Sequence, residues 1–193
     1  MRYLYSHIFF VFAAVTPLDS TDAVIMGIYD TQAGGNSRRA TPDFGISQYL
    51  LGEAPPNAAD GDLSTKYRGF GTCSNGDYDL SCGLNTGFYL VSNRDEMLIT
   101  GFQVCTANDH PERDPMTVTL EGTNRSERAL IFGSNWNLIY SGNCGLSINP
   151  DRNTCGLLQP LNNSIYYKNY RFLVSSKRHA SDSVQYSEVK LFG

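Results

Sequence analysis

Hydrophobic and polar residues alternate along much of this chain, and runs with the 3.6-residue period of a helix are hard to find. Gly, Pro, Asn or Asp residues, which are typical of turns, bound each alternating run. Because a strand directs successive side chains to opposite faces, the pattern predicts short strands with one face buried. The predicted strands cover residues 98–104, 117–121, 136–140, 170–174 and 184–191. Strands joined by turns favour an all-β fold, a sandwich of two antiparallel sheets.

Composition agrees with this fold and excludes two classes of partner. The chain has 193 residues, a one-domain length, with 18 Gly, 8 Pro, 10 Phe and 12 Tyr, residues that suit strands and turns more than helices. The net charge of −4 argues against nucleic acid, which needs a basic face, and against electrostatic docking on anionic membranes. The polar stretch 34–56 is long for a loop, and such loops are usually functional or mobile.

The N-terminus is typical of an export signal. Arg2 is followed by an apolar run at Ile8–Val15 that is much shorter than the ~20 residues of a membrane-spanning helix. We therefore expect a signal peptide at 1–20 and a secreted domain at 21–193, with no membrane span. The alternative is that the apolar run forms a first β-strand of the domain.

Five cysteines in an exported chain predict disulfides with one thiol left over. Cys73 and Cys82 flank a Gly- and Asp-rich loop, and Cys144 and Cys155 flank an expected hairpin tip. Proximity across these turns predicts the pairs Cys73–Cys82 and Cys144–Cys155. Cys105 lies within a predicted strand, where we expect a buried, unpaired thiol. The absence of a Cys-x-x-Cys pair argues against zinc.

No catalytic motif appears in the sequence. It lacks the Gly-x-Ser-x-Gly elbow, the metalloprotease helix motif and a phosphate-cradling loop. Glu112 and Asp114 flank Arg113, an arrangement more typical of a salt-bridged loop than of an acid–base pair. We therefore expect a binding protein and no enzyme.

Two distant segments have the composition of a site for one hard cation. Asn57–Thr65 contains Asp60-Gly61-Asp62, and a loop of this kind turns several oxygens inward. Calcium takes about six to eight oxygens in irregular geometry, so a second segment with one carboxylate, Ser187–Gly193, completes a plausible set. Alone, Asp-Gly-Asp is typical of ordinary turns.

The order and spacing of these and other stretches resemble the discoidin, or coagulation-factor C-type, family of the galactose-binding-like superfamily. The resemblance covers most of the chain from about residue 25, and its other matching stretches include 100–104, 106–109, 111–115, 120–124, 136–139, 151–154 and 170–172. It implies a jelly-roll β-sandwich. It also implies a structural calcium ion bound by main-chain oxygens or side chains of Asn57, Asp60, Asp62, Thr65, Ser187 and Glu188.

In proteins of this superfamily the ligand binds on loops at one end of the sandwich, and the resemblance favours a carbohydrate or lectin-like site. The matching loops contain Arg68, Asn108, Asp109 and Arg113 for paired hydrogen bonds to sugar hydroxyls, and Tyr67 or Phe70 for an aromatic face. Each residue also has a purely architectural interpretation. Arg113 can pair with Asp109 or Asp114, and Phe70 can cover the end of the sandwich.

A second class of function stays open at this point. We find no catalytic domain in this sequence that a binding module would direct to a substrate. The chain is therefore also consistent with a structural or adhesive subunit of an extracellular assembly whose partners are proteins, including identical copies. The first hypothesis predicts a glycan or glycoprotein partner. Asn124 and Asn162 begin glycosylation sequons on expected turns.

Overall fold

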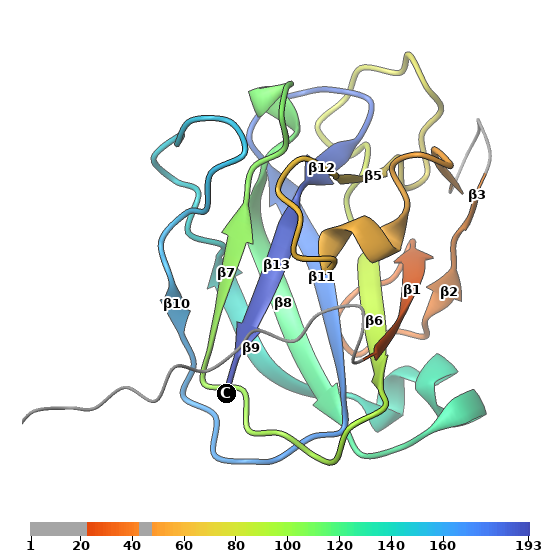
Figure 1. The fold of residues 1–193 in the computed structure, drawn as a ribbon. Coiled ribbons are helices and arrows are strands. Elements are labelled where there is room, and N and C mark those ends of the chain that lie inside the picture. The colour runs from red at the N-terminus through yellow and green to blue at the C-terminus, as the bar shows by residue number, and fades with distance from the viewer. Residues whose placement is uncertain (1–22, 43–47) are drawn as a thin grey trace, which may run out of the picture.

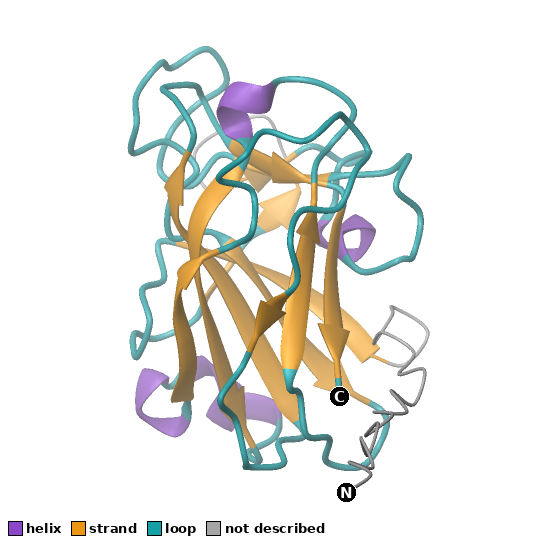
Figure 2. Ribbon diagram, turned by 90° about the vertical axis from the view of Figure 1, so that its left-hand side faces the viewer, coloured by secondary structure: helices purple, strands orange, loops and turns teal. Residues whose placement is uncertain are grey.

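The computed structural model describes residues 23–42 and 48–193. Within these ranges two layers of antiparallel sheet pack face to face as a jelly-roll β-sandwich, in agreement with the sequence (Figures 1 and 2). The predicted signal peptide, residues 1–20, and its alternative as a first strand lie outside the described residues. No helix in the described part of the chain is long and apolar enough to cross a membrane.

One layer is a six-stranded sheet in the order β2-β1-β6-β11-β8-β9. All its neighbouring strands pair antiparallel. Its strands are β1 Ala23–Tyr29, β2 Arg38–Arg39, β6 Gly87–Ser92, β8 Pro115–Thr123, β9 Asn137–Asn143 and β11 Asn169–Lys177.

The second layer consists of two smaller sheets, β10-β7-β13 and β12-β5-β4-β3. Their strands are β3 Thr41–Pro42, β4 Gln48–Tyr49, β5 Tyr67–Gly69, β7 Gly101–Cys105, β10 Gln159–Pro160, β12 Val184–Tyr186 and β13 Glu188–Phe192. The helical elements are short 3-10 turns, η1 Pro55–Ala58, η2 Pro111–Arg113, η3 Glu127–Ile131 and η4 Gly133–Asn135.

The predicted strands appear with shifted bounds. The last one, 184–191, is two strands in different sheets, because Ser187 separates β12 from β13 and donates its hydroxyl to Thr106 O. The stretch 34–56, expected to be one long loop, instead contains β2, β3 and β4. The sequence pattern missed these strands because two residues are too few to show an alternation of hydrophobic and polar positions.

The core lies between the layers and is rich in aromatic side chains. Phe88 and Phe172 stack with ring centroids 5.8 Å apart, and Phe172 also meets Phe102 and Tyr186 edge to face. The backbone of β6 lies so close to β11 that a Cβ on Gly87 would stand 1.9 Å from a carbonyl oxygen. Glycine is therefore required at this position.

A buried ion pair lies on the outer face of the large sheet. Arg171 of β11 stands directly opposite Glu121 of β8 and donates two hydrogen bonds, of 2.7 and 2.9 Å, to its carboxylate. The β1–β2 connection covers the pair. Gly34 N–H donates to Glu121, and Arg171 donates to Gly35 O. The Arg171 guanidinium also lies 4.8 Å from the centre of the Trp136 ring.

The structure corrects one of the two predicted disulfides. Cys73 pairs with Cys82 as expected, whereas Cys105, predicted to be unpaired, pairs with Cys155. The segment around Cys155 runs antiparallel to the end of β7, as Gly156 N–H bonding to Val104 O shows, so Cys155 faces Cys105.

The thiol left over is Cys144, and the predicted Cys144–Cys155 bridge is wrong. Cys144 is buried and donates its thiol hydrogen to Pro115 O at 2.9 Å. Burial raises the pKa of this thiol to about 12. The two segments do meet, since Leu157 N–H donates to Gly145 O, but the Cys144 thiol turns to Pro115 O while Cys155 faces Cys105.

The two ends of the sandwich differ in what they carry. We call the end that bears η2, the disulfide loop 73–82 and the segment 178–183 the upper end (Figure 1). The lower end bears η3, η4 and the C-terminus (Figure 1).

Candidate functional site

The predicted cation loop closes on the distant carboxylate. Glu188 Oε1, at the start of β13, accepts hydrogen bonds from the N–H groups of Asp60 and Gly61 at 3.0 and 2.9 Å. Gly61 adopts a φ of 81°, which glycine accommodates without strain. Asp60 in turn accepts a hydrogen bond from the Thr65 hydroxyl at 2.8 Å. The fold therefore brings together residues 128 positions apart that the sequence assigned to one site.

Electrostatics at this loop favour a cation. Glu188 is buried, and burial together with the facing Asp60 carboxylate raises the pKa of Glu188 to about 7. Among the described residues no Lys, Arg or His forms an ion pair with either carboxylate. Two adjacent carboxylates with a hydroxyl beside them are hard oxygen ligands of the kind calcium prefers. The donor set fits the predicted ion.

The other predicted ligands occupy different positions around the loop. The Asp62 carboxylate is exposed and accepts from Ser64 N–H, which lowers the pKa of Asp62, while Asp62 O faces the Thr65 hydroxyl at 3.0 Å. Asn57 uses its amide to hold the loop, donating to Gly52 O and Lys66 O. Ser187 is buried beside Glu188. The resemblance implies main-chain oxygens as the ligands from Asn57, Asp62 and Ser187.

Both aromatic residues assigned to a sugar face are inside the protein. Tyr67 is 1% exposed and Phe70 is fully buried. Tyr67 packs edge to face against Tyr186, with ring centroids 5.6 Å apart. The Arg68 guanidinium covers the Phe70 ring at 4.7 Å. The prediction that either ring contacts ligand is therefore wrong, and the architectural interpretation of Phe70 is the correct one.

The two arginines assigned to ligand meet on one carboxylate that sequence reasoning missed, Asp182. Arg68 bonds to Asp182 Oδ2 at 2.7 Å, and Arg113 lies 3.1 Å from Asp182 Oδ1. Burial by itself would raise the pKa of Asp182. The hydrogen bond from Ser183 and the two guanidiniums outweigh it and hold this pKa below its usual range. The architectural alternative, in which an aspartate pairs with Arg113, agrees with this contact, but the partner is Asp182 and neither Asp109 nor Asp114. Asp114 is instead paired with Arg152.

Burial and the neighbouring Arg68 lower the pKa of Arg113. Arg68 also lies 3.8 Å from Glu53, so two carboxylates, Asp182 and Glu53, face the two guanidiniums. The Arg113 Nε–H is buried and has no acceptor among the described residues. A buried donor without an acceptor costs about 1–3 kcal/mol, so this N–H is a polar group that the fold leaves unsatisfied.

Asn108 and Asp109 lie next to this cluster and are held by a lysine. Lys66 donates to Asn108 Oδ1 at 3.0 Å and to Asp109 Oδ1 at 2.7 Å. Gln185 donates to Asp109 as well. Asn108 is exposed and keeps its amide N–H groups for a ligand. The four polar residues predicted for ligand binding, Arg68, Asn108, Asp109 and Arg113, therefore lie in one connected network.

The disulfide loop adds an exposed aromatic residue to this end. Gly76 N–H bonds to Asp182, and Asp79 pairs with Ser181, so the loop 73–82 lies against the arginine cluster. Within the loop Tyr78 is 78% exposed. Residues of this network that the sequence did not reveal are Asp182, Lys66 and Gln185, and Tyr78 lies on the neighbouring loop. Their signal was weak, since each comes from a segment without a recognisable motif.

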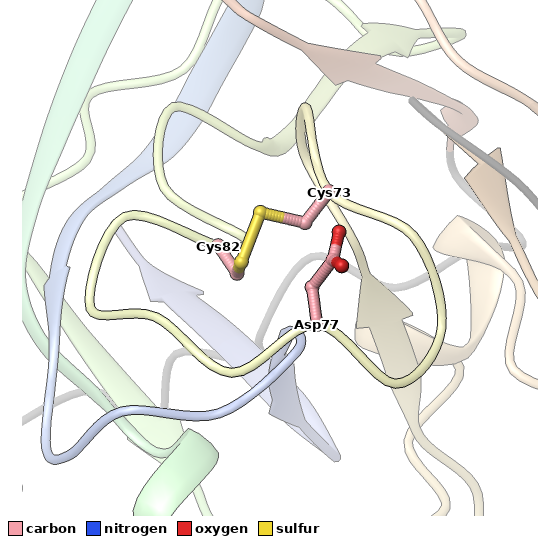
Figure 3. Close-up of side chains that lie close together, drawn as sticks. All are labelled: Cys73, Asp77 and Cys82. Carbon is pink, nitrogen blue, oxygen red and sulfur yellow. A yellow bond between two sulfur atoms is a disulfide. The ribbon is translucent and has the colours of Figure 1, made fainter.

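The same loop contains a group of residues that resembles a metal site but is not one. The sulfurs of Cys73 and Cys82 lie close to the Asp77 carboxylate (Figure 3). Both sulfurs are bonded to each other, and Asp77 accepts a hydrogen bond from Ser74 N–H at 2.7 Å. A disulfide has no thiolate to offer a metal. The disulfide and this hydrogen bond hold the loop in its conformation.

The sequence matches no protein-family model and no curated protein. The structure, however, is similar to those of family 32 carbohydrate-binding modules. One, a CBM32 from Clostridium perfringens solved in complex with GalNAc-β-1,3-galactose, has a TM-score of 0.57 and 13% identity, covering 92% of this chain and 100% of that one. Another, the family 32 module of Clostridium perfringens NanJ in complex with galactose, has a TM-score of 0.58 and 8% identity over 92% and 98%. The fold is the galactose-binding-like jelly roll.

A third similar structure comes from a different genus. The C-terminal domain of a Bacteroides fragilis chitobiase has a TM-score of 0.54 and 12% identity over 92% of this chain and 97% of that one. At these identities the similarity establishes the fold, which is related to that of discoidin domains. The binding chemistry has to be argued from the side chains.

Proposed function

We propose that this chain is a non-catalytic, extracellular glycan-binding module that takes its ligand at the upper end and is stabilised by calcium. The observation that carries the proposal is the arginine cluster on Asp182. It gathers the half-buried guanidiniums of Arg68 and Arg113 on one carboxylate, in the same network as the exposed amide of Asn108. Such donors suit the hydroxyl and carbonyl oxygens of a sugar. The solved modules with this fold that were crystallised with galactose-containing ligands support the same class of ligand.

Tyr78 supplies the aromatic surface in this proposal. Its exposed ring stands on a loop that the disulfide and Asp182 hold in place, so little order has to be gained on binding. An aromatic ring next to polar groups suits a sugar, which has an apolar C–H face and a polar rim. Tyr78 thus replaces the buried Tyr67 and Phe70 of the original prediction.

Calcium stabilises the neighbouring loop in this proposal and takes no part in ligand contact. Asp60 and Glu188 would bind it through carboxylates and Thr65 through its hydroxyl. The ion would supply the positive charge that the two carboxylates lack. The ligands come from the loop after η1 and from β13, so the ion would fasten the loop to the strand and raise stability by mass action.

Two disulfides support the extracellular part of the proposal, because disulfides persist in oxidising compartments. The assembly-subunit alternative, with identical copies or other proteins as partners, predicts no binding of free sugar by the monomer.

Glycan binding is tested by calorimetry with galactose and N-acetylgalactosamine, backed by a glycan array run on the monomeric fraction from size exclusion. Tyr78→Ala is expected to weaken binding about 10-fold while leaving the melting temperature nearly unchanged, because the exposed ring makes few internal contacts. Val24→Ala, an exposed apolar change on the outer face of β1, is the matched control and should bind like the unmodified protein.

Arg113→Ala complements this test. Removing a charge-assisted hydrogen-bond donor is expected to cost about 1.5–3 kcal/mol of binding free energy, with some loss of stability because Asp182 loses a partner. Unchanged affinity in both Tyr78→Ala and Arg113→Ala would exclude the Asp182 cluster as the sugar site. No binding of any arrayed glycan by the unmodified monomer would favour the assembly subunit.

A further inference from the structure

A hollow of about 590 Å³ opens at the lower end of the sandwich, at the opposite end from the proposed ligand loops. It lies between the end of β8, the η4–β9 junction and the segment 165–167. Hydrogen-bonding side chains dominate its lining, with one aromatic ring: Asn124, Arg125, Ser134, Asn135, Asn137 and Tyr167. Its volume falls in the range of small-ligand sites, about 300–1,000 Å³.

Hydrogen bonds to distant segments hold the walls of this hollow. The Asn124 amide bonds on both sides, donating to Tyr166 O at 3.1 Å and accepting from Lys168 N–H at 2.8 Å. The main chain of Arg125 is also fixed, because its carbonyl accepts from the Asn169 side chain at 2.6 Å. These residues connect the β8–η3 turn to the start of β11. The hollow is therefore pre-formed.

The opposite wall is equally well held. The Asn135 amide donates to Ala129 O at 2.8 Å, and the Trp136 indole N–H donates to Leu130 O at 3.0 Å. These bonds join η4 to η3. Asn137 then begins β9 opposite Gly122, so the sheet fixes its position.

Several side chains that line the hollow have no hydrogen-bond partner, whereas the residues that form its walls are hydrogen-bonded to other segments. Within the described ranges the Arg125 guanidinium, the Ser134 hydroxyl and the Asn137 amide have no hydrogen bond or ion pair, and the lining contains no carboxylate. Among the described arginines, Arg39 and Arg128 likewise form no ion pair, whereas a carboxylate pairs with each of Arg38, Arg68, Arg113, Arg152, Arg171 and Arg178. A fixed wall with unpaired donors and acceptors is suited to an external polar ligand.

We propose that this hollow is a second glycan site, and that it takes an acidic sugar. Arg125 would bind the sugar carboxylate through paired N–H···O bonds, the geometry that a guanidinium and a carboxylate share. Ser134 and Asn137 would exchange hydrogen bonds with ring hydroxyls, and the exposed side chain of Ile165 would cover the C–H face. The proposal rests on the proposed function only for the class of ligand, since it uses none of the same residues.

The test follows backbone and side-chain amide signals by NMR while the protein is titrated with D-glucuronic acid. Glucose is the neutral counterpart and sodium acetate the bare carboxylate. The protein should carry no N-glycan, because Asn124 begins a sequon. We expect glucuronic acid to shift the signals of Asn135, Asn137 and Arg125, and glucose and acetate to shift them at least 10-fold more weakly.

Arg125→Gln is expected to weaken this binding roughly 10-fold or more, since a charge-assisted pair is lost. Its melting temperature should stay within about 2 °C of the unmodified protein, because the guanidinium makes no internal bond. Arg128→Gln, a neighbouring exposed arginine outside the hollow, is the matched control and should bind normally.

The outcomes separate this site from the upper one. Equal shifts with glucose would overturn the acidic preference, and equal shifts with acetate would overturn a sugar site in favour of a simple anion site. Shifts confined to the upper end, or unchanged affinity in Arg125→Gln, would overturn the lower site altogether. Loss of galactose binding in Arg113→Ala with intact glucuronic acid binding would support two independent sites. Failure of galactose to bind at all would count against the proposed function and leave the lower-end result to be judged by itself.

Discussion

Two glutamates of this protein are almost completely buried, and their surroundings are opposite. Glu121, on the outer face of the large sheet, is fully buried against the guanidinium of Arg171. Glu188, at the start of β13, is 3% exposed and faces a second carboxylate, that of Asp60. Burying a charge costs several kcal/mol unless a partner compensates it. Within residues 23–42 and 48–193 the protein supplies that partner for Glu121 and none for Glu188.

The two glutamates differ in whether a cation of the protein neutralises their buried charge. The Glu121–Arg171 pair also receives hydrogen bonds from and donates them to the β1–β2 connection, so both ions are satisfied inside the protein. Glu188 has two N–H donors but no cation. We infer that the first glutamate contributes to the fold under all conditions and that the second contributes fully only when a metal ion is bound.

The largest effect is expected from breaking the complete pair. Arg171→Met leaves the Glu121 carboxylate buried without a cation, and this should reduce the free energy of unfolding by about 3–5 kcal/mol. For a chain of this length the melting temperature should fall by about 10 °C. The fall in melting temperature is measured by following thermal unfolding with circular dichroism.

The double variant Arg171→Met with Glu121→Gln is the control for this prediction. It removes both charges and should recover a large part of the lost stability, because no uncompensated ion remains. A double variant as unstable as Arg171→Met alone would mean that the hydrogen bonds to the β1–β2 connection, and not the charge, dominate.

A somewhat smaller effect is expected from adding calcium, the cation proposed to bind the Asp60 and Glu188 carboxylates. Calcium at about 100 times its dissociation constant should stabilise the protein by about 2.7 kcal/mol relative to chelator. The corresponding rise in melting temperature is about 5–10 °C. No shift between chelator and added calcium would remove the ion from the proposed function while leaving the sandwich and the glycan sites standing.

Glu188→Gln tests whether the missing charge is the cause. Glutamine still accepts from Asp60 N–H and Gly61 N–H, so in chelator this variant should be at least as stable as the unmodified protein. In calcium it should show a much smaller stabilisation, because one anionic ligand is gone. A variant that loses stability in chelator would contradict the view that Glu188 is uncompensated.

The smallest effect is expected from comparing two aspartates of the same loop. Asp60→Asn removes a carboxylate that faces Glu188, so the calcium-induced shift in melting temperature should fall by half or more. In Asp62→Asn the shift should change by less than about 1 °C, because the side chain points to Ser64 N–H and asparagine can accept the same bond. Equal losses in the two variants would show that Asp62 binds the ion through its side chain.

The sequence by itself determined the class of fold and the cation loop. Alternating residues at 117–121 and 170–174 became the centre of the large sheet, in β8 and β11, because period-two patterning reports which face is buried. Asp60, Thr65 and Glu188 came together as the resemblance implied. The strand signal is local in the chain, whereas the meeting of the loop with Glu188, 128 positions away, followed from the family resemblance.

Only the tertiary structure decided which residues pair across loops. Cys155 bonds to Cys105 and not to Cys144 because strand register, and not sequence distance, sets which sulfurs meet. Arg113 pairs with Asp182, although two aspartates lie nearer to it in sequence. Phe70, one residue beyond the end of β5, is fully buried. Contacts between segments far apart depend on how the two layers stack, and neither composition nor spacing encodes that in a form that can be read along one chain.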